Sequence, residues 1–84
     1  MIKILYFARL KESLGKASEE FQLPYQNFTI ASLMTLLSSR GETWGREFGQ
    51  GSTLRAAINY DVAREESILK DGDEVAFFPP VTGG

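Results

Sequence analysis

The residues with the clearest chemical potential are the two glycines that close the chain, in the sequence Phe78-Pro79-Pro80-Val81-Thr82-Gly83-Gly84. The last atoms of such a chain are a backbone carboxylate with no side chain beside it. Because glycine has no Cβ, this end can enter a slot too narrow for any other residue. We therefore expect the Gly84 carboxylate to be presented to the active site of another protein.

Chemistry at this carboxylate requires help from outside the chain. An α-carboxylate with a pKa of about 3.3–3.7 is ionised at neutral pH and is a poor electrophile. No glycine-rich run precedes a Lys-Ser or Lys-Thr pair, the pattern that cradles nucleotide phosphates. The chain also contains no cysteine and no histidine, so a thiol nucleophile, the usual zinc sites and the commonest general base are all missing. Gly84 is thus the only credible reactive group.

Composition indicates a single small domain. The 84 residues suit one domain, and 43% hydrophobic residues are enough for a core and argue against disorder. The net charge of −2 and the lack of a basic cluster argue against binding to nucleic acid. We expect no membrane association and a cytoplasmic location, because we find no signal-peptide pattern and no apolar run near the roughly 20 residues that a membrane helix needs.

The sequence predicts one main helix over residues 30–40. Thr29 is a suitable N-cap, and the apolar residues Ile30, Leu33, Met34 and Leu37 follow helical spacing. Residues 42–50 remain ambiguous, because Trp44 and Phe48 suggest a short helix while three nearby glycines favour a loop. We expect the two aromatic residues to form a satellite cluster beneath that loop. The other expected elements are a helical turn at 8–14 and strands at 2–7, 18–23, 54–59, 62–63 and 74–78.

This order of elements predicts an α+β fold of the β-grasp, or ubiquitin-like, type. We expect a mixed sheet of four to five strands with the main helix packed across it. Residues 1–78 would form the domain and residues 79–84 a flexible, extended C-terminal tail. Strand alternation places Phe77 and Phe78 on opposite faces of the sheet, so only one of them can face the helix. We assign Phe77, with Val75 and Ile4, to the core.

The segment 71–84, with the sequence DGDEVAFFPPVTGG, closely resembles the C-terminus of the small subunit of molybdopterin synthase, a sulfur carrier of the ubiquitin-like β-grasp family. Residues 1–8 look like the opening strand of that family, and residues 56–59 resemble its third strand. The resemblance covers both ends and the length of the chain, whereas residues 16–53 match only in pattern.

The resemblance implies a role in molybdenum cofactor biosynthesis. An adenylyltransferase similar to ubiquitin-activating enzymes would use ATP to convert the Gly84 carboxylate to an acyl-adenylate. Sulfur passed on from a donor would then replace the nucleotide and give a thiocarboxylate. The large subunit of molybdopterin synthase would take in the charged tail, and two such sulfurs would convert cyclic pyranopterin monophosphate to the dithiolene of molybdopterin. The chain would thus be a non-catalytic subunit of a two-plus-two heterotetramer, with no cofactor or metal of its own.

The tail composition suits this role. Pro79-Pro80 favours a stiff, extended backbone that has little entropy left to lose on docking. Val81 could act as an apolar anchor, Thr82 could donate a hydrogen bond within a channel, and Gly83 allows close approach around the reacting carbonyl. The resemblance further implies that Phe7, Val62 and Phe78 form an apolar surface that docks the large subunit.

Three alternatives remain open at this point. A sulfur carrier of thiazole biosynthesis shares the fold and the diglycine, although such proteins are generally shorter and lack the Phe-Phe-Pro-Pro sequence. A ubiquitin-like protein modifier would be conjugated through Gly84 to lysine amines. A plain interaction module would carry an inert tail.

Overall fold

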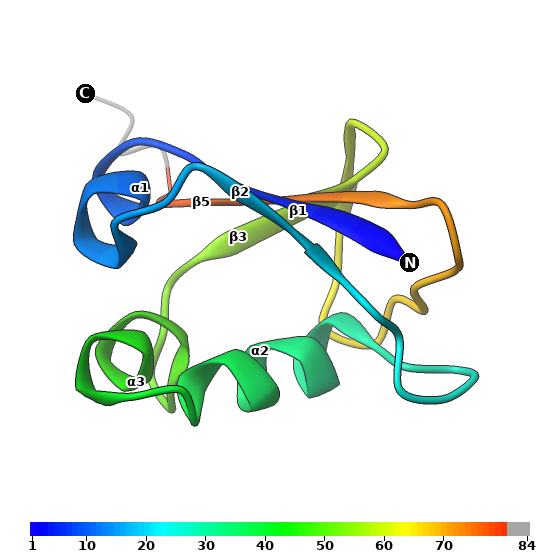
Figure 1. Cartoon of the computed structure of the whole chain (residues 1–84), viewed down its shortest axis with the longest axis horizontal. Coiled ribbons are helices and arrows are strands. Elements are labelled where there is room, and N and C mark those ends of the chain that lie inside the picture. The colour runs from blue at the N-terminus through cyan, green and yellow to red at the C-terminus, as the bar shows by residue number, and fades with distance from the viewer. Residues whose placement is uncertain (81–84) are drawn as a thin grey trace.

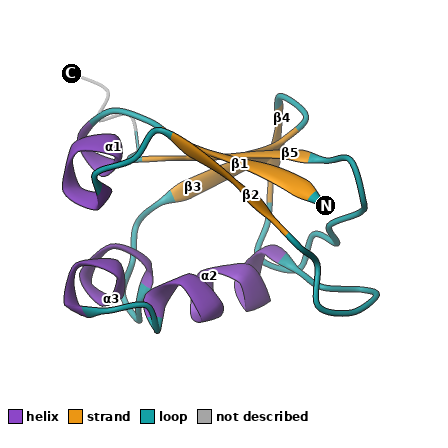
Figure 2. Cartoon of the chain, viewed as in Figure 1, coloured by secondary structure: helices purple, strands orange, loops and turns teal. Residues whose placement is uncertain are grey.

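The computed structural model describes residues 1–80, and the expectations for Val81, Thr82, Gly83 and Gly84 lie outside this range. Five strands and three helices are present (Figures 1 and 2). In chain order they are β1 (Ile2–Tyr6), α1 (Arg9–Leu14), β2 (Ser18–Phe21), α2 (Ile30–Ser38), α3 (Glu42–Phe48), β3 (Arg55–Ile58), β4 (Asp61–Ala63) and β5 (Glu74–Phe78).

The five strands form one mixed sheet in the order β2-β1-β5-β3-β4. β1 and β5, the first and last strands of the chain, are central neighbours and run parallel, with Ile4 opposite Val75. The other neighbouring strands pair antiparallel. Helices α2 and α3 lie on one side of the sheet and leave its other side uncovered (Figure 1). This arrangement confirms the predicted β-grasp fold.

Helix α2 begins where the sequence predicts. The Thr29 hydroxyl oxygen accepts a hydrogen bond from the Ser32 amide at 3.1 Å and so caps the first turn. Ile30, Leu33 and Leu37 point into the core and are buried. The amides of Ile30 and Ala31 donate to the carbonyls of Ser67 and Glu65, which ties the helix start to the segment before β5. The helix ends at Ser38, two residues earlier than expected.

Residues 42–48 form helix α3, and this corrects the expected satellite cluster. Phe48 is buried in the main core, where its ring meets Phe77 edge-on with ring centres 5.0 Å apart. Trp44 stacks on Phe48 at 5.9 Å and meets the edge of Tyr6 at 5.7 Å. α3 therefore closes one end of the single core, because it brings aromatic side chains beneath both central strands.

The predicted core residues Ile4, Val75 and Phe77 are completely buried. The predicted strand 74–78 matches β5 at both ends, whereas the predicted strands 2–7, 18–23 and 54–59 run one or two residues too long. The predicted strand 62–63 is one residue too short, because β4 begins at Asp61. Among residues 1–80, no helix is both long enough and apolar enough to cross a membrane.

Candidate functional site: the uncovered face of the sheet

The uncovered face of the sheet carries a row of apolar side chains. Strand alternation turns Ile4 and Val75 toward the helices, so their neighbours Leu5 and Ala76 turn away from the core. The register places Leu5 opposite Ala76 and Ala76 opposite Ala57, and Ala57 is in turn opposite Val62. One row of small and branched side chains therefore crosses four strands, and we call Leu5, Ala76, Ala57 and Val62 the apolar row.

Phe7 and Phe78 lie beside this row at the end of the sheet where the chain leaves β5. The Phe7 amide donates to the Phe77 carbonyl at 3.2 Å, which continues the parallel pairing one residue beyond β1. Phe7 remains 48% exposed and Phe78 is half-buried. Because both follow core residues on paired strands, their rings share the uncovered face.

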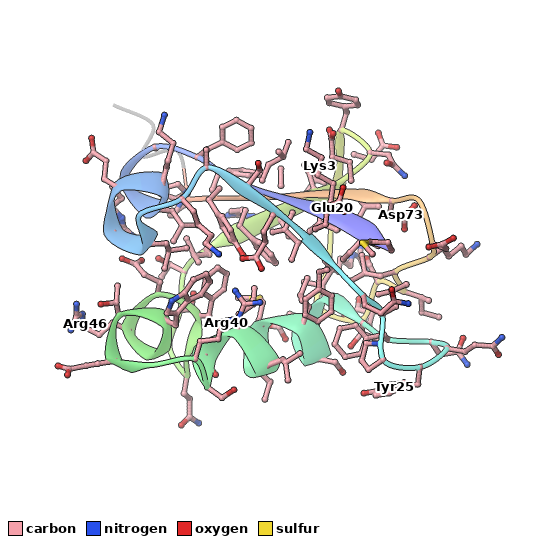
Figure 3. All side chains as sticks on the ribbon, in the orientation of Figure 1. Lys3, Glu20, Tyr25, Arg40, Arg46 and Asp73 are labelled. Carbon is pink, nitrogen blue, oxygen red and sulfur yellow. The ribbon has the colours of Figure 1, made fainter. Side chains whose placement is uncertain are left out.

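Charged residues occupy the opposite end of the same face. Lys3 lies opposite both Glu20 on β2 and Glu74 on β5, and Lys3 and Glu20 can be followed together on this part of the sheet (Figure 3). The charged residues of the face therefore lie mainly near the start of β5, with the exposed Arg55 as a further charge opposite Phe78. Such a surface suits a protein partner, because interface centres are apolar and their rims are charged.

The structure brings together the three residues expected at a partner interface. Val62 is 75% exposed, and it shares the uncovered face with Phe7 and Phe78. The half-buried Pro80 lines a surface groove of about 500 Å³ together with Leu54, Arg55 and Arg64. Pro79 is also half-buried. The remaining predicted tail residues, 81–84, are outside the described part.

Sequence reasoning missed four residues of this face. Leu5, Ala57 and Ala76 are ordinary strand residues, and only the strand register shows that they adjoin Val62. Tyr60 is 90% exposed at the β3–β4 turn. The sequence did contain a signal for Tyr60, because a large aromatic residue is unusual in a turn. Predicting the turn did not by itself show that its side chain is exposed.

A second cluster of polar residues lies on the other side of the sheet, toward the helices. The Tyr6 hydroxyl donates to Glu19 Oε2 at 2.7 Å, and the Arg40 guanidinium donates to both Glu19 oxygens at 2.8 and 2.9 Å. Arg40 also lies over the Trp44 ring at 4.7 Å, between the sheet and the helices (Figure 3). The cluster joins β1, β2 and the end of α2, so its role is structural.

The pKa shifts in this cluster follow from burial and pairing. Burial alone would raise the pKa of Glu19, but the hydrogen bonds from Arg40 and Tyr6, with the Arg40 and Lys16 charges, lower it overall. Burial raises the pKa of the Tyr6 hydroxyl, and its bond to Glu19 adds to this effect. The bond to Glu19 raises the pKa of Arg40. The cluster therefore holds one carboxylate and one guanidinium as a fixed ion pair.

The mixed sheet, the crossing helix and the uncovered apolar face define a ubiquitin-like β-grasp domain suited to binding other proteins. The ThiS family model matches residues 4–84. The molybdopterin synthase sulfur carrier subunit of Escherichia coli (strain K12) is 38% identical over 84 residues, which cover 100% of both chains. The chain belongs to the ThiS family, and the resemblance to the small subunits of molybdopterin synthase is confirmed.

Several solved structures share the fold of this chain. A chain from Pyrococcus furiosus, provisionally described as subunit 1 of molybdopterin converting factor, matches with a TM-score of 0.80 and 30% identity over 95% of this chain and 97% of that chain. SAMP1 from Haloferax volcanii matches with a TM-score of 0.78 and 25% identity over 99% and 98% of the two chains. A chain from a Helicobacter pylori complex of subunits 1 and 2 of molybdopterin-converting factor shares the fold, with a TM-score of 0.67 and 21% identity over 99% and 97%.

Proposed function

We propose that this chain is the sulfur carrier subunit of a molybdopterin synthase. The observation that carries the proposal is the full-length match to the Escherichia coli subunit of that name, in which both chains align from end to end. In this role the chain performs no catalysis of its own. It acts in the cytoplasm, and its reactive group is the Gly84 carboxylate.

The proposed cycle has two steps at Gly84. A partner adenylyltransferase transfers AMP from ATP to the carboxylate, releases pyrophosphate and so makes the carbonyl carbon electrophilic. A sulfur nucleophile supplied through a partner then displaces AMP and leaves a thiocarboxylate. The chain needs no cofactor for either step, since ATP is bound by the partner.

The charged tail then delivers sulfur in the large subunit. There, two thiocarboxylates from two small subunits would supply the sulfurs that convert cyclic pyranopterin monophosphate to the molybdopterin dithiolene. Pro79 and Pro80 favour an extended backbone, and six residues, 79–84, reach at most about 20 Å. That reach would let Val81, Thr82 and Gly83 enter a channel of the large subunit while the domain stays outside.

The uncovered face is the proposed docking surface for the large subunit. A stable interface buries about 800 Å² on each partner, which is more than a narrow tail offers. Phe7, Phe78 and Val62 supply an apolar centre next to the point where the tail begins, and the charged end of the face supplies a rim. Docking through this face would hold the tail at the entrance of the large-subunit active site, in a two-plus-two assembly.

A second function is favoured by one observation. SAMP1 from Haloferax volcanii, a small archaeal modifier protein, shares the fold at 25% identity. A modifier would be joined through Gly84 to lysine amines on other proteins. A thiazole-biosynthesis carrier would also bear a thiocarboxylate, so the acceptor of the sulfur distinguishes it from the main proposal.

Intact mass spectrometry tests the main proposal directly. After incubation with the adenylyltransferase, ATP and a sulfur donor, the chain should gain the mass difference between one sulfur and one oxygen, located at Gly84. With the large subunit and cyclic pyranopterin monophosphate present, the mass should return to its initial value as dithiolene forms. A chain lacking Gly84 should show neither change while still binding the large subunit through its folded domain.

The outcomes separate the candidate functions. An unshifted mass under these conditions argues against sulfur carriage. A thiocarboxylate that forms but is never discharged by the large subunit favours the thiazole pathway. Covalent adducts to protein lysines favour a modifier.

A further inference from the structure

The two-residue turn between β3 and β4 contains an unusual backbone conformation. Ile58 pairs with Asp61 to close the hairpin, and both turn residues have positive φ, 49° at Asn59 and 74° at Tyr60. Positive φ at both central positions is the pattern of a type I′ turn, which matches the twist of the flanking strands. Asparagine and glycine are the preferred residues in such turns.

Asn59 is explained by its contacts. Its side-chain amide donates to Asp73 Oδ1 at 2.9 Å, and its side-chain oxygen accepts from the Glu74 amide at 3.0 Å. Its own amide donates to the Glu74 carbonyl at 2.8 Å. These bonds fix the turn to the start of β5, and asparagine tolerates the left-handed conformation.

Tyr60 has no such explanation within the fold. A bulky residue with positive φ is an outlier that costs stability, and glycine would occupy the position with less strain. The side chain is 90% exposed, and within residues 1–80 no hydrogen bond or ring contact from it is present. The fold therefore gains nothing from this ring, which suggests that the ring serves a contact outside the chain.

The position of Tyr60 indicates which surface it belongs to. The β3–β4 turn projects from the sheet on the side away from α2 and α3 (Figures 1 and 2). Val62, the last member of the apolar row, follows two residues later on the same side. Tyr60 thus adds an exposed aromatic ring to this face at the end of the sheet where β5 begins. Tyrosine is among the residue types that dominate binding energy at interfaces.

We propose that Tyr60 is an aromatic anchor for the large subunit of molybdopterin synthase. This inference rests on the proposed function. Arg55 begins β3 and pairs with Phe78, the last residue of β5 before the tail. Tyr60 follows the other end of β3. At about 3.3 Å per residue, that separation is about 10 Å or more along the strand. A contact so far from the tail widens the surface that a docked large subunit would cover.

The neighbours of Tyr60 define the chemistry of the complementary surface. Asp61 is exposed beside it, and Asp73 and Glu74 adjoin the turn through Asn59. An apolar pocket rimmed by lysine or arginine side chains on the partner would therefore receive the ring.

The substitution Tyr60→Gly tests this proposal, because fold and binding should respond in opposite directions. Relief of the left-handed strain should raise the thermal midpoint by about 4 °C. Loss of the ring should weaken binding to the purified large subunit at least about tenfold, measured by calorimetry. Tyr60→Asn, which also tolerates positive φ, should show the same loss of binding without unfolding.

Tyr25→Ala is the matched control. Tyr25 is another exposed aromatic residue, 60% accessible, and it lies in the loop on the helix side of the molecule (Figure 3). Its removal should leave binding unchanged. The proposal would be overturned if Tyr60→Gly bound the large subunit as tightly as the wild type does. It would also be overturned if the variant lost affinity only for the adenylyltransferase, or if its thermal midpoint fell. If the wild-type chain itself does not bind the large subunit, the proposed function fails and not merely this contact.

Discussion

Glu19 shows how a single carboxylate can join three parts of a fold. It lies on β2, receives a hydrogen bond from Tyr6 on β1, and pairs through two hydrogen bonds with Arg40 beyond the end of α2. Bidentate pairing with arginine restricts geometry as well as adding energy. The sheet and the main helix are therefore fastened to each other at this residue.

We predict that Glu19→Gln destabilises the domain by about 2 kcal/mol at pH 7, because charged hydrogen bonds are lost and Arg40 keeps its charge without a counterion. The pKa of Glu19 is lowered in the folded state, so its contribution is complete above its ordinary pKa. The contribution is lost as the pH falls through the lowered folded value. The difference from wild type should therefore shrink as the pH falls below about 4.5.

Urea unfolding at a series of pH values measures this effect. Glu12→Gln serves as the control, because Glu12 is exposed on α1 and forms no ion pair within the described residues. An unfolding free-energy difference for Glu19→Gln that stays constant from pH 7 to pH 3 would contradict the assignment.

At the scale of elements, helix α3 depends on a close backbone approach at its C-terminal end. The Gly49 amide donates to the Gly45 carbonyl at 2.9 Å. A Cβ built on Gly49 would lie closer to the Gly45 carbonyl oxygen than real atoms approach. Only glycine therefore fits this end of the helix without a shift of the backbone.

We predict that Gly49→Ala destabilises the domain by about 1–3 kcal/mol, because the clash must displace α3 and with it the buried Phe48. Chemical denaturation followed by Trp44 fluorescence gives the measurement, since Trp44 stacks on Phe48. The neighbouring Gln50→Ala, at an exposed position, should change the unfolding free energy by less than about 0.5 kcal/mol. Equal stability of the two variants would rule out the close approach.

The sequence predicted elements best where local pattern and final structure agree. α2 could be predicted because its N-cap and apolar spacing are both local signals. The strand pattern likewise separated Phe77 from Phe78. α3 stayed ambiguous because Gly45 and Gly49 reduce helix propensity, while tertiary packing of Phe48 against Phe77 stabilises the helix. Local pattern contains no information about such a partner.

The candidate site was predictable only in part for the same reason. Phe7, Val62 and Phe78 came from the family resemblance, and the structure places them on one face. Leu5, Ala57 and Ala76 could not be found from the sequence, because their adjacency depends on strand register across distant segments. The expectations for residues 81–84 stay predictions.

At the scale of the whole molecule, the two sides of the layered fold should differ in function. The uncovered face is proposed to dock the large subunit, and α2 and α3 cover the other side of the sheet. We predict that Val62→Arg weakens binding to the large subunit by about 2 kcal/mol or more, because it places a charge in the apolar centre. Folding should be unaffected, since Val62 is 75% exposed.

Leu36→Arg provides the comparison for this prediction. Leu36 is 43% exposed on α2, away from the uncovered face, and its substitution should leave the affinity unchanged. Affinities for both variants can be measured by calorimetry, with circular dichroism as the check of folding. Equal losses in the two variants would show that binding does not distinguish the two sides.

The parallel pairing of β1 with β5 has a consequence for the time course of synthesis. Lys3 pairs with Glu74, and at about 5–20 residues per second a ribosome needs several seconds to make the chain between them. During that interval β1 can pair with β2, but its other neighbour, β5, has not yet been made. The surface that contains Ala76 and Phe78 then appears only when β5 enters the sheet. A partner that binds this surface would therefore bind only copies in which β5 has joined the sheet. Incomplete or misfolded copies would not be bound.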